Sequence, residues 1–513
     1  MSGIIDSGML QYVPKGAYYE EKDEQFKAVK KMWDGLFDYD RALFALTSIL
    51  NGTGFSKGAM THKLLSNPVK TTSDGRDLAV PDGLDSEFER KVIEYNLTKL
   101  AEKQMARALR NLLMLSGAEL HSRVNNSRTR KVILGFLFDR DCKELDSLAI
   151  NFKTKLAKLV RHALGKQDLF HILNGDAQLF VKKIGKYNKL AFPVVCHLFN
   201  RMPTALGEIR GHFPKIDDYW KAKSMAQMGN IKEFEKLIYK LPWRVAMGFR
   251  NSYKLDIDKS KIMGEAKMSN KEELTLEAAV KRSGAKSRKV NYKAQDLYDL
   301  WKALYFKMAT DNPENTGEIA EAIDEKTAKL SKLDLGDSCA VVLDASHSMH
   351  GSEERPMHPF LTGLCVIAAI ENVQDVFIVS GRWKELEGTD KRVVFPANAS
   401  PLWKGLVDAV VSDAKNIIVI SDGYENAVKG MFEHVYKHFK DSGHEFNVIH
   451  INPVFAADSK SGTTRALAND ITPMPVGSYK YLETEFIFNQ MIENTEVVKQ
   501  LLIQKYQKLI GGS

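Results

Sequence analysis

Cysteine is scarce in this chain of 513 residues, which contains only four. They lie far apart, each in or beside an apolar run, and their spacing fits no zinc motif: Cys142, Cys196, Cys339 and Cys365. Isolated cysteines of this kind are typical of reduced thiols in the core of an intracellular protein. We therefore expect a cytoplasmic protein without a disulfide framework.

Long apolar runs are also missing. A membrane-spanning helix needs roughly eighteen or more apolar residues in succession, and the sequence has no such run. Residues 1–16 lack the charged and apolar regions of a secretory signal, so none is expected there. Apolar residues make up 44% and charged residues 27% of the chain, which is typical of globular proteins, and the length predicts two or three domains.

The motifs of several enzyme classes are absent as well. The sequence has no Gly-x-x-x-x-Gly-Lys-Ser/Thr loop, and its spacing reveals no Ser-His-Asp or Cys-His arrangement. His347, His350 and His358 are irregularly spaced and lack a cysteine scaffold, so a zinc site is not favoured. We expect a protein that is not an enzyme, and a metal-dependent hydrolase is the least favoured alternative.

Positive charge is concentrated in the first two-thirds of the chain. Residues 1–335 contain 57 Lys and Arg against 43 Asp and Glu, a net charge of +14. Residues 336–513 contain 16 basic and 22 acidic residues, a net charge of −6. A polyanion, if one binds, is therefore expected on the first region.

Residues 1–335 have a mostly helical pattern with short breaks. No fixed repeat aligns, yet many helices of a few turns each are typical of a degenerate helical-repeat (HEAT-like) solenoid. A compact all-helical domain is the alternative, but a region of this length exceeds one ordinary core. Helices are expected at 86–116, 128–138, 142–164, 176–184, 189–199, 231–240, 271–282, 294–309 and 313–332.

Residues 336–513 have a different period, in which short apolar runs alternate with helical stretches. This pattern predicts a second domain with a parallel, doubly wound α/β sheet. Strands are expected at 339–343, 376–379, 392–395, 417–420 and 446–451, and helices at 356–372, 402–411, 428–440 and 482–510. Residues 455–477 have no clear pattern and are expected to form a loop.

The first of these runs ends in Asp344-Ala-Ser-His-Ser348, which places one carboxylate and two hydroxyls at alternate positions of one loop. Oxygen ligands at the carboxyl end of a buried strand suit Mg²⁺. The alternative is that Asp344 only caps the next helix. A second strand ends in Asp422, and Ser400 places a hydroxyl just before the helix at 402–411.

These three loops, in this order, resemble the metal-ion-dependent adhesion site of the von Willebrand factor A domain. The resemblance implies Asp344, Ser346, Ser348, Ser400 and Asp422 as ligands of Mg²⁺ or another divalent cation. It also implies an open coordination position that a partner's carboxylate can fill. Two residues depart from the family pattern: Ser400 stands where Thr is usual, and His347 where glycine is common.

Two basic stretches of the helical region are candidates for nucleic-acid binding. Residues 121–131 and 151–166 combine positive charge with a helix start and with an amphipathic helix, respectively. The candidate side chains are Arg123, Arg128, Arg130, Lys131, Lys155, Lys158, Arg161, His162 and Lys166. A solvated surface is the simpler alternative. Basic residues 281–293 and the rings of Phe249 and Tyr292 are weaker candidates, since the rings could equally pack in a core.

A basic helical module followed by an A domain resembles the Ro autoantigen family, whose helical part is called the TROVE module. The resemblance implies a ring of helices that binds small non-coding RNA or single-stranded RNA, as part of a ribonucleoprotein. The other reading is a metal-dependent protein–protein adhesion or assembly factor, in which the helices are a scaffold and do not bind RNA.

Overall fold

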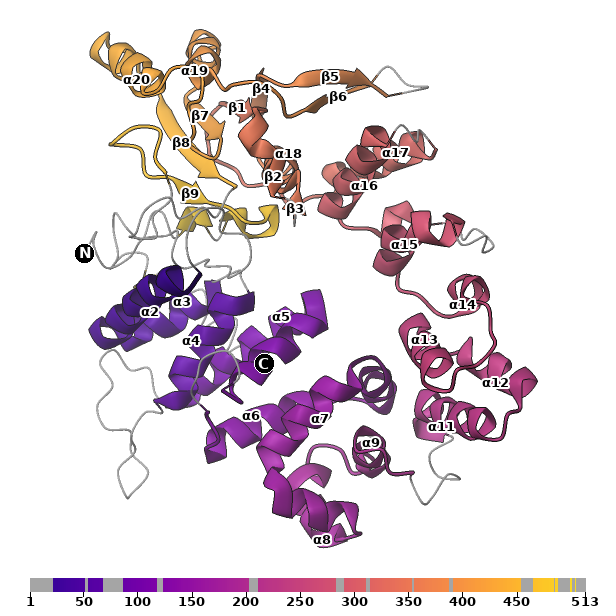
Figure 1. Cartoon of the computed structure of the whole chain (residues 1–513). Coiled ribbons are helices and arrows are strands. Elements are labelled where there is room, and N and C mark those ends of the chain that lie inside the picture. Colours follow the sequence, from indigo (N-terminus) through magenta and orange to yellow (C-terminus); the bar gives the residue numbers. More distant parts are fainter. Residues whose placement is uncertain are drawn as a thin grey trace. The chain divides into compact units, whose positions relative to one another are not determined.

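The structure is a computed structural model that describes residues 22–50, 54–67, 86–117, 123–202, 211–282, 290–310, 314–352, 355–386, 391–453, 465–483, 485–487, 499–500 and 503. The chain packs as two compact units (Figure 1). One consists of Lys57–Asn291, and the other combines Met1–Ser56 with Tyr292–Ser513.

Among its described residues, the unit Lys57–Asn291 consists of helices joined by turns and loops, with one isolated β-bridge between Pro242 and Lys267. Its helices are α4 (Gly54–Ser66, which begins in the other unit), α5 (Ser86–Met114), α6 (Ser127–Phe138), α7 (Cys142–Leu173), α8 (Ala177–Phe180), α9 (Phe192–Leu198), α11 (Pro214–Gln227), α12 (Ile231–Ile238), α13 (Trp243–Ser252), α14 (Lys259–Glu265) and α15 (Asn270–Arg282). A π-helical turn, η2 (Val181–Gly185), follows α8 directly. Asn126, Asp141 and Asn230 cap the helices that follow them by accepting a backbone N–H.

The helices predicted from the sequence in this unit are present, with ends that differ by a few residues. Helix α7 runs past its predicted end at residue 164, but Gly165 interrupts it with a φ of +82°. Helices α4, α11, α13 and α14 were not predicted. Neighbouring helices pack in pairs, among them α6 with α7 and α11 with α12. Closure into a solenoid or ring stays a prediction.

The other unit contains a five-stranded parallel sheet with the strand order β4-β1-β7-β8-β9. The strands are β4 (Val373–Val379), β1 (Cys339–Asp344), β7 (Asn416–Ile420), β8 (Asn447–Asn452) and β9 (Met474–Pro475). Strand β1 is buried along its whole length. The predicted parallel sheet is therefore present, and β9 lies inside the stretch that was expected to be a loop.

Helices cover both faces of this sheet. They are α18 (His358–Ala368), α19 (Leu402–Val411) and α20 (Met431–Asp441). Gly405 of α19 lies against Val342, whereas Gly363 of α18 lies against Leu343. Successive residues of a strand point to opposite faces, so α18 and α19 lie on opposite sides of β1. Phe432 of α20 shares the core cluster of α19. The arrangement is doubly wound, as the sequence predicted.

One predicted strand belongs elsewhere. Residues Arg392–Phe395 form β6, which pairs antiparallel with β5 (Arg382–Glu385) in a hairpin separate from the main sheet. The hairpin is attached to α16 (Leu297–Ala309), because the Tyr305 hydroxyl donates to the Val394 carbonyl at 2.8 Å. The strand itself is present where it was predicted, but its expected place in the parallel sheet was wrong, because a run of four residues does not determine which strand pairs with it.

The compact units divide the chain differently from its secondary structure. Helices give way to strands between α17 (Thr316–Ala328) and β1, whereas packing groups α2 (Lys22–Tyr39), α3 (Arg41–Leu50), α16 and α17 with the sheet. The domain boundary at residues 335–336 stays a prediction. The helix expected at 482–510 lies largely outside the described residues. Within the described ranges, no helix is both long and apolar enough to cross a membrane.

Candidate metal centre and candidate nucleic-acid interface

The candidate metal centre lies where the chain reverses direction across the sheet. From β1 the chain continues to β4 on one side, and it later returns to β7 on the other. In doubly wound sheets, ligands bind beside the carboxyl ends of the two strands at such a point. Asp344 is the last residue of β1, and Asp422 follows β7 by two residues.

Short hydrogen bonds fix the first loop. Asp344 Oδ1 accepts the backbone N–H of Ser346 at 2.8 Å, and its Oδ2 accepts the Ser421 hydroxyl at 2.8 Å. The hydroxyl oxygens of Ser346 and Ser348 lie 3.0 Å apart. Ser421 was not predicted as part of this site, although it stands directly before Asp422 in the sequence.

The two carboxyl groups are buried close to each other. Burial raises the pKa of Asp344, although hydrogen bonds from Ser346 and Ser421 and the nearby Ser400 hydroxyl act in the opposite direction. Burial, followed by the negative charge of Asp344, raises the pKa of Asp422 to about 6. Hydrogen bonds from the Tyr424 amide and the Ser348 hydroxyl oppose that shift. A cation between the carboxylates would offset both the desolvation of the two charges and the repulsion between them.

Ser400 is the fifth predicted ligand, and it is fully buried. Its hydroxyl lies near enough to Asp344 to lower the pKa of that carboxyl. It nevertheless has no hydrogen bond of ordinary geometry to any described residue. A buried hydroxyl without a hydrogen bond, aimed at a carboxylate, has an oxygen to offer to a cation.

All five predicted ligands therefore lie in one cluster. Two carboxylates and three hydroxyls are a hard oxygen set that fits Mg²⁺, with water completing the coordination. No group of three or more His, Cys, Asp or Glu suited to a metal occurs among the described residues, so the candidate depends on the hydroxyls. His347 and His350 are exposed and stack on each other at 6.2 Å.

A positive side chain that the sequence did not predict lies beside this cluster. The Arg465 guanidinium lies 3.6 Å from the centre of the Tyr424 ring, and its charge acts on Asp422 to lower the pKa. Gly423, between Asp422 and Tyr424, has a φ of +81° and would bring a Cβ within 2.7 Å of the Arg465 carbonyl. Only glycine allows that approach.

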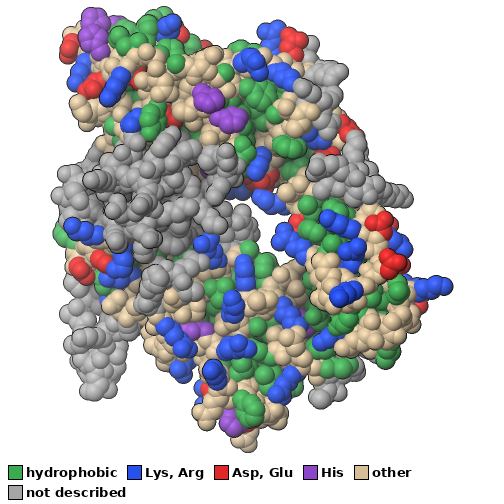
Figure 2. Space-filling view, in the orientation of Figure 1, with side chains coloured by type: hydrophobic (Ala, Val, Ile, Leu, Met, Phe, Trp, Pro, Cys, Tyr) green, Lys and Arg blue, Asp and Glu red, His purple; other side chains and the backbone are tan. Residues whose placement is uncertain are grey.

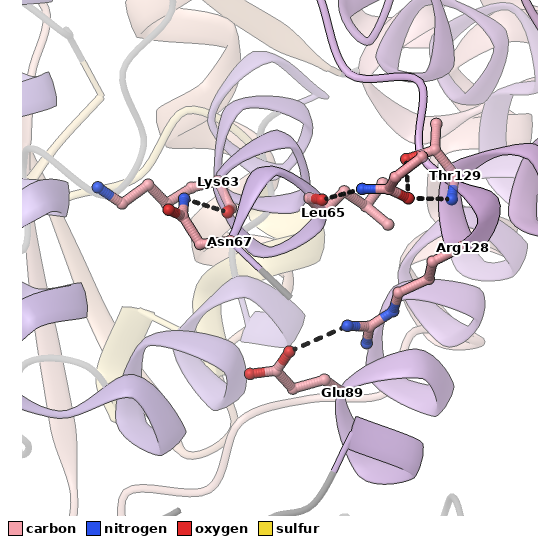
Figure 3. A network of polar contacts seen from close by, with 7 residues as sticks. Lys63, Leu65, Asn67, Glu89, Arg128 and Thr129 are labelled. Atoms are coloured by element: carbon pink, nitrogen blue, oxygen red, sulfur yellow. Dashed lines mark hydrogen bonds and ion pairs between the residues drawn. The ribbon is translucent and has the colours of Figure 1, made fainter. Parts of the chain in front are cut away.

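The first basic stretch is anchored at the start of α6 (Figure 3). Asn126 caps the helix by accepting the Thr129 N–H at 2.8 Å, and its amide donates to the Leu65 carbonyl of α4 at 2.8 Å. Arg128 forms a 3.4 Å ion pair with the buried Glu89 of α5. Arg128 thus has a partner within the protein, which makes it a weaker phosphate ligand than predicted.

The other members of that stretch face solvent. Arg123, Arg130 and Lys131 are exposed, and Arg130 Nε donates to the Asn125 side chain at 3.1 Å. On α7, Lys158, Arg161 and Lys166 are exposed and Lys155 is partly exposed. These seven side chains are available to a ligand.

His162 is an exception, and its predicted place on the basic face was wrong. Its side chain is buried, with Nε2 2.8 Å from the Val124 carbonyl. Burial lowers the pKa of His162, and the charges of Arg123 and Arg130 lower it further. The ring therefore joins α7 to the segment before α6 as a neutral group.

Further lysines extend the basic surface beyond the predicted residues. Between residues 151 and 201 the chain has ten Lys and Arg and only two Asp and Glu. Lys182, Lys186 and Lys189, on and after η2, are exposed. Figure 2 shows many basic and few acidic side chains on the visible surface over α6 to α9. The unit Lys57–Asn291 as a whole has 45 basic and 26 acidic residues, or +19.

The predicted base-stacking rings are not on this surface. Phe249 and Tyr292 are buried, and Phe249 belongs to the core formed by α11 to α14. They pack in the core, which was the alternative interpretation. In the basic segment 281–293, residues 283–289 lie outside the described residues.

No family model matches this sequence, and neither does any curated protein. Among solved structures, the RO (RSR) protein of Deinococcus radiodurans aligns with 88% of this chain and 92% of its own. The chain is similar to a Ro protein. The identity is 13% and the TM-score is 0.44.

Proposed function

We propose that this chain is an RNA-binding protein of the Ro type and not an enzyme. The observation that carries the proposal is the surface over α6, α7 and η2, defined by Arg123, Arg130, Lys131, Lys155, Lys158, Arg161, Lys166, Lys182, Lys186 and Lys189. We call it the basic surface. None of these side chains forms an ion pair with a described acidic residue, so their charge is available to phosphates.

The kind of RNA follows from the chemistry of this surface and from the family resemblance. Lysine and arginine contact phosphates without reading the base sequence. The proposed ligands are small non-coding RNA or single-stranded RNA, bound with an affinity that falls steeply as salt rises. A polyanion that binds through phosphates alone would show little preference among base sequences.

Charge reversal tests the proposal. The triple variant Lys155→Glu, Lys158→Glu and Arg161→Glu should weaken RNA binding and reduce the slope of log affinity against log salt by about 2. The matched control is Lys232→Glu, Lys236→Glu and Lys240→Glu, on and just after α12, which makes the same change in net charge at exposed positions. Fluorescence anisotropy with labelled RNA gives both numbers. Equal effects of the two variants, or no salt-sensitive binding by the wild type, would exclude the proposal.

A second candidate function concerns the metal centre. We propose that Asp344, Ser346, Ser348, Ser400 and Asp422 hold Mg²⁺ and that the bound ion offers a coordination position to a partner's carboxylate. The closeness of two buried carboxylates supports this proposal. In an adhesion or assembly factor, Asp344→Ala would abolish partner capture. In an RNA-binding protein, the same variant would leave RNA affinity nearly unchanged.

A further inference from the structure

Two lysines outside the predicted sites lie over the same aromatic ring. Lys153 Nζ, on α7, lies 4.6 Å from the centre of the Tyr219 ring and 5.9 Å from that of Trp220. Lys223, which follows Trp220 by one turn of α11, has its Nζ 4.6 Å from the centre of the Trp220 ring. Asn200 accepts a hydrogen bond from Lys153 Nζ at 2.9 Å.

The backbone explains how Lys153 reaches this place. Phe152, the residue before it, leaves the helical conformation with φ −127° and ψ 24°, so α7 bends there. Asn200 has a φ of +58°, just after α9. These two local departures bring α7, α9 and α11 together around the lysine ammonium.

No carboxylate balances the two ammonium groups within the described residues. Each lies over the indole face, whose negative quadrupole compensates a cation only in part. Burial, followed by the charge of Lys223, lowers the pKa of Lys153 to about 8. His197 is buried beside them, and burial and then Lys153 lower its pKa to about 3, so it adds no charge at neutral pH.

The site also contains a hydrogen-bond donor without an acceptor. Trp220 is 6% exposed, and its Nε1 has no partner among the described residues. Tyr219, the other ring, is kept neutral because burial raises the pKa of its hydroxyl. The surroundings of the two lysines thus contain cations, donors and neutral rings, which is the composition of an anion site.

We propose that Lys153 and Lys223, held over Tyr219 and Trp220, bind one phosphodiester group of a polynucleotide. The inference rests on the proposed RNA-binding function and assigns to it a site that lies beside the basic surface. A phosphate placed between the ammonium groups supplies the missing negative charge. It would also hold one nucleotide next to a partly exposed aromatic ring, Tyr219.

Binding at this site should depend on pH in a way that binding at ordinary surface lysines does not. A phosphate favours the charged form of Lys153, so binding raises the pKa of this lysine above its value in the free protein. Binding then takes up a proton above about pH 8, and affinity falls as the pH rises. Between about pH 7 and pH 9 the loss approaches tenfold if only the charged form binds. An exposed lysine with an ordinary pKa near 10.4 stays charged over the same range.

The experiment measures the affinity for a labelled oligoadenylate, whose bases do not titrate in this range, at constant salt. Wild-type affinity should fall about tenfold from pH 7 to pH 9. Lys153→Arg keeps the charge at all these pH values, so its affinity should be nearly independent of pH. Lys223→Met removes the neighbouring charge, and the fall should begin at a higher pH. Lys158→Met is the control: it should lower affinity equally at every pH.

The outcomes separate this inference from the proposed function. If the wild type binds no oligoadenylate at any pH, the RNA-binding proposal fails. If it binds, but Lys153→Arg retains the same pH dependence, the Lys153–Lys223 site is wrong and RNA binding stands. Lys153→Arg differs from the wild type only in the head group, and circular dichroism checks that the variant is folded.

Discussion

Replacing Asp422 by Asn tests whether the two buried carboxylates, Asp344 and Asp422, form a cation site. The pKa of Asp422 is raised from 3.8 to about 6, a shift that corresponds to about 3 kcal/mol at neutral pH. Asn removes the charge but keeps an oxygen that can accept the Tyr424 N–H. In EDTA near neutral pH, we therefore expect Asp422→Asn to stabilise the sheet by about 1–3 kcal/mol.

In Mg²⁺ the wild type should be more stable than Asp422→Asn, the reverse of their order in EDTA. At a concentration a hundredfold above its dissociation constant, Mg²⁺ stabilises the wild type by about 2.7 kcal/mol, and the variant by much less. Because the chain has two compact units, hydrogen exchange of the β1 and β7 amides is a better assay than a single melting temperature. Glu425→Gln is the control, since Glu425 accepts the Phe432 N–H near the cluster without joining it.

In EDTA, the stability of the sheet should fall as the pH rises. A carboxyl whose pKa is raised in the folded state contributes stability below its unfolded pKa and loses it as the pH rises through the folded value. In EDTA, β1 and β7 should therefore lose protection between about pH 4 and pH 6, and the loss should be smaller in Asp422→Asn. An unchanged response to Mg²⁺ in Asp422→Asn, or a strong destabilisation in EDTA, would refute this reasoning.

Three further predictions concern packing or hydrogen bonds inside one unit or the other. Gly405→Val should destabilise the sheet by about 1–3 kcal/mol in urea unfolding, because even a Cβ would meet Val342 at 2.5 Å. Tyr305→Phe removes the hydrogen bond to the Val394 carbonyl, and we expect a loss of about 1 kcal/mol, visible as faster exchange in β5–β6; unchanged exchange would contradict it. Asn126→Ala removes a helix cap and should cost about 1–2 kcal/mol in the helical unit; a stable variant would show that the cap is replaceable.

The sheet and its cluster of carboxylates and hydroxyls could be predicted because a buried parallel strand is visible in the sequence as a local apolar run. Strand β1 is a continuous apolar run, and parallel strands bring their carboxyl ends to one edge, so Asp344 and Asp422 had to approach each other. The same reasoning could not find Arg465, which reaches the cluster from a segment without any pattern. Its contact with Tyr424 depends on a turn at Gly423.

The basic surface was predicted in character but less well in detail. Helical periodicity placed His162 beside the lysines of α7, yet the ring turns toward the carbonyl of Val124 in a preceding segment. Arg128 likewise faces Glu89, far earlier in the chain. Lys153 was not among the predicted residues, and the bend at Phe152 directly before it could not be seen in the sequence. Such choices depend on tertiary neighbours that periodicity does not contain.

The beginning and the end of the chain meet in one compact unit, and this has a consequence for synthesis. Lys499 is buried and forms a 2.6 Å ion pair with Asp40, a contact that spans 459 positions. Lys57–Asn291 emerges from the ribosome entirely before the first strand of the sheet, so it can fold while translation continues. The Asp40–Lys499 ion pair can form only when the last part of the chain has been made, so α2 and α3, which flank Asp40, cannot reach their final surroundings before then.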